Sequence, residues 1–84
     1  MIVIMQIEED TPYEGYYTHY YTLKCDSVEA AKESWNNAVE SGRKENLGRF
    51  KFHGLLCTTR ELDCYWVVDF MTVEEWVEAR KLEA

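Results

Sequence analysis

Apolar and polar positions alternate along two stretches near the start of the chain. Residues 2–8 (IVIMQIE) and residues 16–25 (YYTHYYTLKC) are rich in β-branched and aromatic side chains at the two-residue spacing of a β-strand. Pro12 breaks the first run, and Gly15 supplies the left-handed backbone that a turn requires. The pattern therefore predicts two strands joined as an antiparallel hairpin.

A helical spacing follows these two strands. Asp26 or Ser27 can cap the start of a helix of about four turns, and Glu29 can close a capping box on Asp26. Gly42 is the expected end of this helix. The helix is predicted to pack on the sheet through one apolar stripe, formed by Val28, Ala31, Trp35, Ala38 and Val39.

Residues 49–58 (RFKFHGLLCT) have the composition of a third strand, and residues 59–63 are expected to form a loop. Strict alternation along this strand would turn Phe50 and Phe52 away from the core. An extra residue at Gly54 would return both rings to the core side, because glycine is the usual occupant of such a β-bulge. We therefore predict a bulge at Gly54.

The stretch from Cys64 to Arg80 (CYWVVDFMTVEEWVEAR) changes from strand spacing to helix spacing at Thr72. Thr72 is a suitable N-cap, and Glu75 stands three residues later to complete a capping box. Trp76, in the first turns of this helix, is expected to join Trp35 in the core. The preceding strand is predicted to bury one face, formed by Cys64, Trp66, Val68 and Phe70.

These elements predict an α+β fold of the order ββαββα, in one small domain that spans residues 1–84. The expected architecture is a two-layer sandwich, in which both helices pack on one face of a four-stranded, mainly antiparallel sheet. The other face of the sheet would then be open. Residues 1–46 and residues 47–84 each read as a ββα unit, so the pattern is also compatible with an internal duplication. The order of the strands does not follow from the pattern.

Composition and charge restrict the classes of function. The sequence is 46% hydrophobic and 14% aromatic, which indicates a folded domain rather than a disordered tail. Nine basic against sixteen acidic residues give a net charge of −7, and no segment is basic enough to follow a phosphate backbone, so direct nucleic-acid binding is not expected. The apolar start (MIVIMQI) has no basic residues before it and is too short to span a bilayer, so we expect a cytoplasmic protein without a membrane contact.

Three cysteines and two histidines are the candidate metal ligands or nucleophiles. Their spacing lacks the close pairs of structural zinc sites, and cysteine is among the residues most often buried for packing alone. We therefore expect free thiols in a reducing compartment, without a metal, a cofactor or a catalytic residue, and no enzymatic activity. The residues concerned are Cys25, Cys57, Cys64, His19 and His53.

The tyrosines and acidic residues around the first turn are the feature that folding explains least. Tyrosine favours strands and stabilises hairpins, but tyrosines beside carboxylates are also common at protein interfaces. We therefore predict a non-enzymatic protein-binding module, an acidic inhibitor of a partner with a basic, nucleic-acid-handling surface. Small acidic anti-defence proteins of phages and mobile elements, such as anti-CRISPR proteins, offer an analogy of size and charge alone. The predicted partner-binding residues are Glu8, Glu9, Asp10, Tyr13, Glu14, Tyr16 and Tyr20.

Two alternatives stay open for the exposed face of the sheet. It could pair two copies as a homodimer, which could also bind a small ligand at that face. It could instead stack single-stranded nucleic acid, with Arg49, Lys51 and His53 near the phosphates, although three such residues are few against a net charge of −7.

Overall fold

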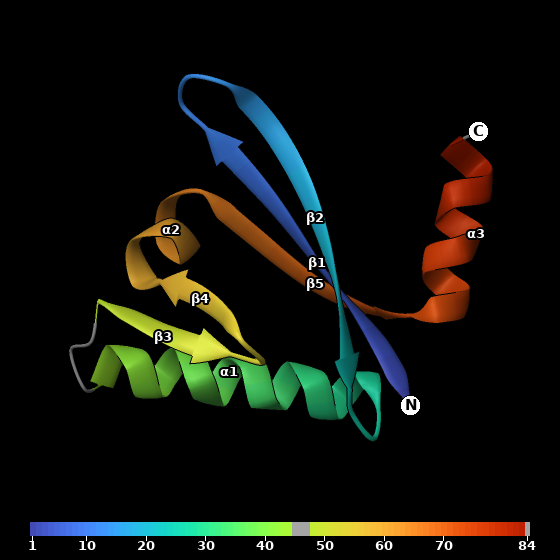
Figure 1. Cartoon of the computed structure of the whole chain (residues 1–84), viewed down its shortest axis with the longest axis horizontal. Helices are drawn as coiled ribbons and strands as arrows, with labels where there is room; N and C mark the ends of the chain where they lie inside the picture. Colours follow the sequence, from blue (N-terminus) through green and yellow to red (C-terminus); the bar gives the residue numbers. More distant parts are fainter. Residues whose placement is uncertain (45–47, 84) are drawn as a thin grey trace.

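Five strands and three helices make up residues 1–44 and 48–83, the part of the chain that the computed structural model describes (Figure 1). The strands are β1 (Ile2–Thr11), β2 (Gly15–Lys24), β3 (Arg49–Phe52), β4 (Leu55–Thr58) and β5 (Trp66–Thr72). The helices are α1 (Val28–Lys44), α2 (Thr59–Cys64) and α3 (Val73–Glu83). The fold is therefore α+β, as predicted, with one more strand and one more helix than expected in these residues. The boundary between the two expected ββα units, at residues 46 and 47, lies outside the described residues.

The predicted hairpin of β1 and β2 is confirmed, and β5 pairs with the other side of β1 to complete a three-stranded antiparallel sheet. The strand order is β2-β1-β5, and Met5 in β1 lies between Tyr21 on one side and Phe70 on the other. Gly15 begins β2 with a φ of 89°, a value that a residue with a Cβ rarely adopts. Residues directly opposite one another point to the same face, so this register fixes which side chains share each face of the sheet.

The prediction of a four-stranded sheet is wrong, because residues 49–58 fold as two short strands and not as one. β3 and β4 pair with each other in a separate two-stranded sheet, and His53 and Gly54 form the turn between them. Their φ values are 49° and 84°, and two positive values in succession are typical of a type I′ hairpin turn. Gly54 thus reverses the chain instead of forming the expected bulge. Phe52 is buried and Phe50 packs against the core, as predicted.

Residues 59–63 are helical and do not form the expected loop. Thr58 caps this helix, α2, since its Oγ1 accepts a hydrogen bond from the backbone N–H of Glu61 (3.2 Å). Cys64 ends α2 and is exposed, so its expected place on the buried face of a strand is wrong. The other three residues predicted for that face do pack in or against the core, namely Trp66, Val68 and Phe70.

α1 begins as predicted but does not end at Gly42. Ser27 is its cap, with an Oγ that accepts a hydrogen bond from the N–H of Ala30 (3.0 Å). The helix continues through Gly42 into a last turn that carries basic residues. A Cβ at Gly42 would lie 3.0 Å from the ring of Phe50, so this position favours glycine because β3 approaches the helix closely there.

α1 and α3 lie on opposite faces of the three-stranded sheet, so the prediction that both helices share one face is wrong (Figure 1). The face that α1 covers, here called the α1 face, carries the core around Met5 and Ile7, into which Trp35 packs. α3 starts with the predicted capping box, in which Thr72 and Glu75 each donate a backbone N–H to the other's side chain (3.2 and 3.0 Å).

Trp76 of α3 does not reach the predicted core. Its ring packs edge-on against Tyr20, whose partner in β1 is Gln6 and which therefore points away from the α1 face. This second face is called the α3 face below. Trp35 is thus the core tryptophan contributed by a helix, with 7% of its surface exposed, whereas Trp76 is half-buried on the opposite side of the sheet.

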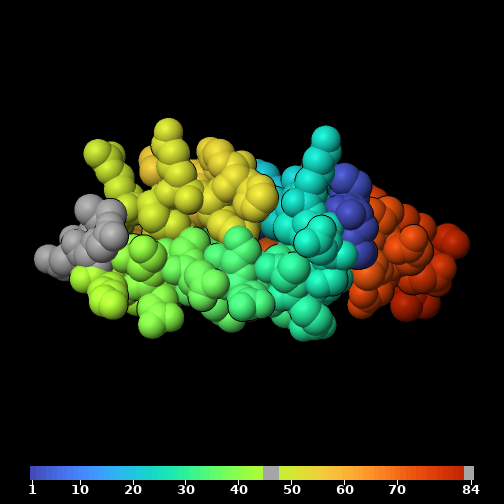
Figure 2. Space-filling model, turned by 90° about the horizontal axis from the view of Figure 1, so that it is seen from below, coloured from blue at the N-terminus to red at the C-terminus, as the bar shows by residue number. Residues whose placement is uncertain are grey.

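The layers together form a thin slab with extents of 41 × 36 × 17 Å. Seen from below, the β3–β4 hairpin lies beside α1 along the slab, and α3 forms one end (Figure 2). In residues 1–44 and 48–83, no helix combines the length and the apolar character that crossing a membrane requires. The hairpin of β1 and β2 reaches the edge of the slab at its turn (Figure 1).

Candidate protein-binding site

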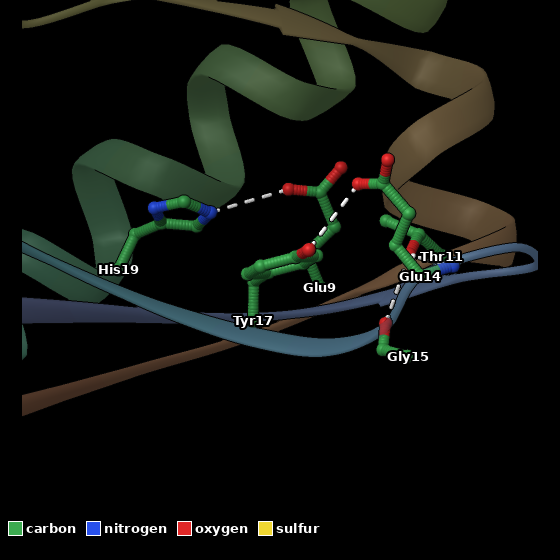
Figure 3. A network of polar contacts seen from close by, with 6 residues as sticks. All are labelled: Glu9, Thr11, Glu14, Gly15, Tyr17 and His19. Atoms are coloured by element: carbon green, nitrogen blue, oxygen red, sulfur yellow. Dashed lines mark hydrogen bonds and ion pairs between the residues drawn. The ribbon is translucent and has the colours of Figure 1, made fainter.

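The turn between β1 and β2 is held by the side chain of Thr11 (Figure 3). Its Oγ1 donates a hydrogen bond to the carbonyl of Gly15 (2.9 Å) and accepts one from the N–H of Glu14 (3.2 Å). Both bonds close the loop on itself, so the residues between the two strands have a defined position. Tyr13 lies in this turn with 95% of its surface exposed, and its ring is available to a partner.

The register divides the predicted binding residues between the two faces of the hairpin. Glu8, Asp10 and Tyr16 point to the α3 face, because Glu8 and Asp10 alternate with the core residues of β1 and Asp10 lies opposite Tyr16. Glu9 points to the α1 face, opposite Tyr17. The acids of this run are therefore neighbours in sequence, but they do not form one cluster in space.

Two carboxylates of the predicted site make local contacts on the hairpin (Figure 3). Glu9 Oε2 lies 3.3 Å from His19 Nε2, and the hydroxyl of Tyr17 donates a hydrogen bond to Glu14 Oε2 (3.2 Å). His19 and Tyr17 are missing from the predicted site. In the sequence, the alternation of residues 16–25 places both side chains on the same face of the second strand. The register of the hairpin then shows that this face lies beside Glu9.

Tyr20, also predicted as a binding residue, lies between β2 and α3. The ring of Trp76 is edge-on to it with centroids 5.7 Å apart, and the guanidinium carbon of Arg80 lies 4.3 Å from the centre of the tyrosine ring. The side chain of Tyr20 is therefore half-buried, and its evident role is to dock α3 on the sheet. A direct contact between Tyr20 and a partner stays a prediction.

A shallow hollow of about 470 Å³ remains where α3 meets the sheet. Gln6 and Glu8 line one side of it, and Trp76 and Arg80 line the other. The buried indole N–H of Trp76 has no acceptor among the described residues. α3 thus covers part of the face that the sequence predicts to be open, and a small ligand on this face stays a prediction.

Five exposed residues at the end of the hairpin are called the tip surface below: Glu8, Asp10, Tyr13, Glu14 and Tyr16. In the part of the chain that the structure describes, no lysine or arginine lies within ion-pair distance of its three carboxylates. Its two tyrosines have 95% and 81% of their surface exposed. Carboxylates without a cation beside exposed phenol rings are suited to bind lysine and arginine side chains of another protein.

The three cysteines differ in their burial. Cys57 is fully buried, and this burial, together with the nearby carboxylate of Glu61, raises the pKa of its thiol to about 11. Cys25 is half-buried and Cys64 is exposed, and all three thiols are free of disulfides. Within residues 1–44 and 48–83, no three histidine, cysteine, aspartate or glutamate side chains come close enough together to hold a metal ion.

No family model, no curated protein and no solved structure matches the chain. The tip surface is therefore the feature from which a function can be proposed. It offers carboxylates, phenol rings and a fixed backbone, but neither an activated nucleophile nor an enclosed cavity. Such a surface is suited to binding another protein.

Proposed function

We propose that this protein is a small acidic binding module without enzymatic activity, which inhibits a partner protein by occupying a basic surface on it. The observation that supports this function is the tip surface. Among the described residues, no lysine or arginine lies within ion-pair distance of its three carboxylates. Glu8 and Asp10 lie on the α3 face with Tyr16, and Glu14 lies on the other side of the turn, where it accepts a hydrogen bond from Tyr17. The rings of Tyr13 and Tyr16 are exposed, and the side chain of Thr11 holds the turn in place. Folding alone requires neither the exposed rings nor the mutual repulsion of the acids.

The chemistry of the tip surface indicates the class of partner. Its carboxylates would pair with lysines and arginines that otherwise hold phosphate, so we propose a nucleic-acid-handling protein as the target, as for the inhibitors that phages and mobile elements use against host defences. Such an inhibitor acts inside the cell. The carboxylates would speed association through long-range attraction, and the tyrosines would slow dissociation by burying their rings in the interface.

Charge reversal at the tip tests this function. The protein is immobilised through the end of α3, away from the tip (Figure 1), and is exposed to a cell extract as wild type and as the Asp10→Lys/Glu14→Lys variant. Glu33→Lys/Glu40→Lys is the matched control, because it makes the same change in net charge on the exposed side of α1. We expect the wild type and the control to retain the same basic protein and the tip variant to lose it. Retention of that protein by all three would contradict the proposal.

The tyrosines of the tip surface are tested with the partner found in this way. Tyr13→Ala and Tyr16→Ala are each expected to raise the dissociation rate by roughly tenfold, as the loss of an aromatic anchor does, while the association rate stays near that of the wild type. Asp10→Lys should instead slow association and flatten its dependence on salt. Surface plasmon resonance at two salt concentrations separates the two effects. Unchanged kinetics in all three variants would move the binding surface away from the tip.

A further inference from the structure

The outer edge of β2 has no strand beside it in the described part of the chain, where β2 pairs with β1 alone. The N–H of Asp10 donates to the carbonyl of Tyr65, on the side of β1 away from β2. Asp10 and Tyr16 are therefore a non-hydrogen-bonded pair of the β1–β2 ladder. The backbone N–H and C=O of Tyr16 consequently point away from β1, toward the outer edge of the sheet. By alternation, the residues that offer their backbone groups at this edge are Tyr16, Thr18, Tyr20, Thr22 and Lys24.

This edge lacks the devices that usually prevent strands from pairing with another chain. Natural edge strands are commonly short, bulged, interrupted by proline or lined with charges. β2 runs for ten residues in unbroken register with β1, and its only lysine, Lys24, is at its end. It also contains no acidic residue, although the whole chain carries a net charge of −7. The edge of β2 is thus long and carries no acidic residue.

The exposed surface area of the chain is larger than expected for a folded monomer of its mass. A folded monomer of this mass is expected to expose about 5,200 Å². This chain exposes 6044 Å², which is about 800 Å² more, and about 800 Å² is the share of one partner in a protein interface of standard size. The radius of gyration is 13.6 Å, against about 12 Å for a typical domain of this length. The thin slab therefore has surface area left for a contact with a second molecule.

We propose that two copies of this chain pair through their β2 edges around a two-fold axis, forming one continuous six-stranded antiparallel sheet. An axis at Tyr20 gives the register that pairs all five outward residues with outward residues of the second copy. Thr18 then lies opposite Thr22 of the second copy, and Tyr16 lies opposite its Lys24. Both are favourable cross-strand pairs, and no two like charges of β2 lie directly opposite each other in this register.

Two further observations support a second copy as the occupant. Lys24 would lie beside Tyr16 of the second copy and near that copy's acidic turn, so the basic end of each strand meets the acidic end of the other. On the α1 face, β2 borders a hollow of about 320 Å³ that Met5, Leu23 and Phe52 help to line. In the proposed register, Tyr17 of the second copy lies opposite Leu23 and would cover part of this hollow.

A pair of charge variants tests both the dimer and its register. Thr18→Lys/Thr22→Lys places lysine opposite lysine at two symmetric points, whereas Thr18→Lys/Thr22→Glu places lysine opposite glutamate. Sedimentation equilibrium should give twice the chain mass of 10.0 kDa for the wild type. In the first variant, repulsion between the lysines should weaken the dimer and raise its dissociation constant by roughly tenfold or more, whereas the second variant should restore the dimer. A monomeric wild type, or two variants that behave alike, would overturn the proposal.

Hydrogen exchange on the wild type gives a test that needs no substitution. Tyr17 and His19 donate to β1 and should be protected at any concentration, whereas the outward amides of Thr18, Tyr20 and Thr22 should gain protection as the concentration rises. Fast exchange of the outward amides in a dimer would overturn the proposal by moving the interface elsewhere. These experiments contain no other protein and change residues outside the tip surface, so a failed dimer test leaves the charge-reversal test of the inhibitory function still to be decided. A dimer that forms would place Lys24 of one copy beside Tyr16 of the other.

Discussion

Trp35 joins three separate parts of the molecule through one indole ring. It belongs to α1, and its ring centre lies 5.0 Å from that of Phe52 in β3 and 6.4 Å from that of Phe70 in β5. Its burial is predictable from the apolar stripe of the helix. Trp76 has the same local signal but packs on Tyr20 across the opposite face. Local spacing indicates the buried side of a helix, but it does not indicate which face of a sheet will receive that side.

Cys57 and Cys64 are close in sequence but should differ sharply in reactivity. Iodoacetamide at about pH 8 is expected to modify Cys64 and to leave Cys57 intact, because Cys57 is buried and its thiol forms little of the nucleophilic thiolate. Peptide mass mapping of the folded protein measures this difference, and a urea-unfolded sample in which both thiols react is the control. Equal modification of both in the folded protein would contradict the position of β4 in the core.

The raised pKa of Cys57 also sets the direction of the effect of alkaline pH. Folding favours the neutral thiol, so the contribution of Cys57 to stability is fully present below its usual pKa of 9.0 and is lost as the pH rises through about 11. Alkylation of Cys57 should therefore begin within this window, as the folded state weakens. A Cys57 that reacts as readily at pH values below it would mean that the thiol is accessible in the folded state.

At the scale of the elements, the correct predictions depend on signals that lie within a few residues of one another. Gly15 marks the first turn, and Ser27 and Thr72 cap their helices, each by a contact within its own turn. The second hairpin is missed because His53 occupies a positive-φ position where Asn, Asp or Gly is the usual signal. β3 and β4 have four residues each, too few for alternation to reveal a reversal of the chain.

The turn of this second hairpin can be tested with a matched pair of glycine substitutions. Gly54 and Gly48 both have open space around the position of a Cβ, but only Gly54 of the two has a positive φ. Gly54→Ala should therefore lower the free energy of unfolding by about 1 kcal/mol, whereas Gly48→Ala should leave it unchanged or slightly higher. Urea unfolding followed by tryptophan fluorescence measures both. Equal effects of the two substitutions would show that residues 49–58 do not reverse at Gly54.

At the scale of the whole molecule, the sequence predicts which residues of the site lie near one another, but it does not predict which face of the sheet each residue occupies. The acids and tyrosines near the first turn are close because the hairpin is local, and Thr11 holds that turn through contacts within it. The separation of Glu9 from Asp10 follows from the alternation of β1, which continues to Thr11, beyond the predicted end at residue 8. The covering of Tyr20 depends on where α3 packs, after the chain has passed through every other element. The periodicity of a segment indicates which of its sides is buried, but it does not indicate which distant segment covers that side.

The proposed dimer couples the stability of the whole molecule to protein concentration. Because only the folded chain presents the edge of β2, association draws the equilibrium toward the folded state, and the melting temperature should rise by roughly 3–5 °C for each tenfold increase in concentration. Thr18→Lys/Thr22→Lys should show a weaker dependence of the melting temperature on concentration than the wild type. Thr18→Lys/Thr22→Glu should recover the dependence, since its lysines and glutamates face each other across the axis.

Net charge adds a second condition to the same measurement. Two copies of net charge −7 repel each other, and their acidic turns lie at the outer ends of the shared sheet, so salt should strengthen the dimer by screening this repulsion. Calorimetry of the wild type over about a hundredfold range of concentration, at low and at moderate salt, should therefore show the steeper dependence at moderate salt. Melting curves that superimpose at every concentration in both salts would mean that the edge of β2 stays unpaired, and the excess exposed surface would then need another partner.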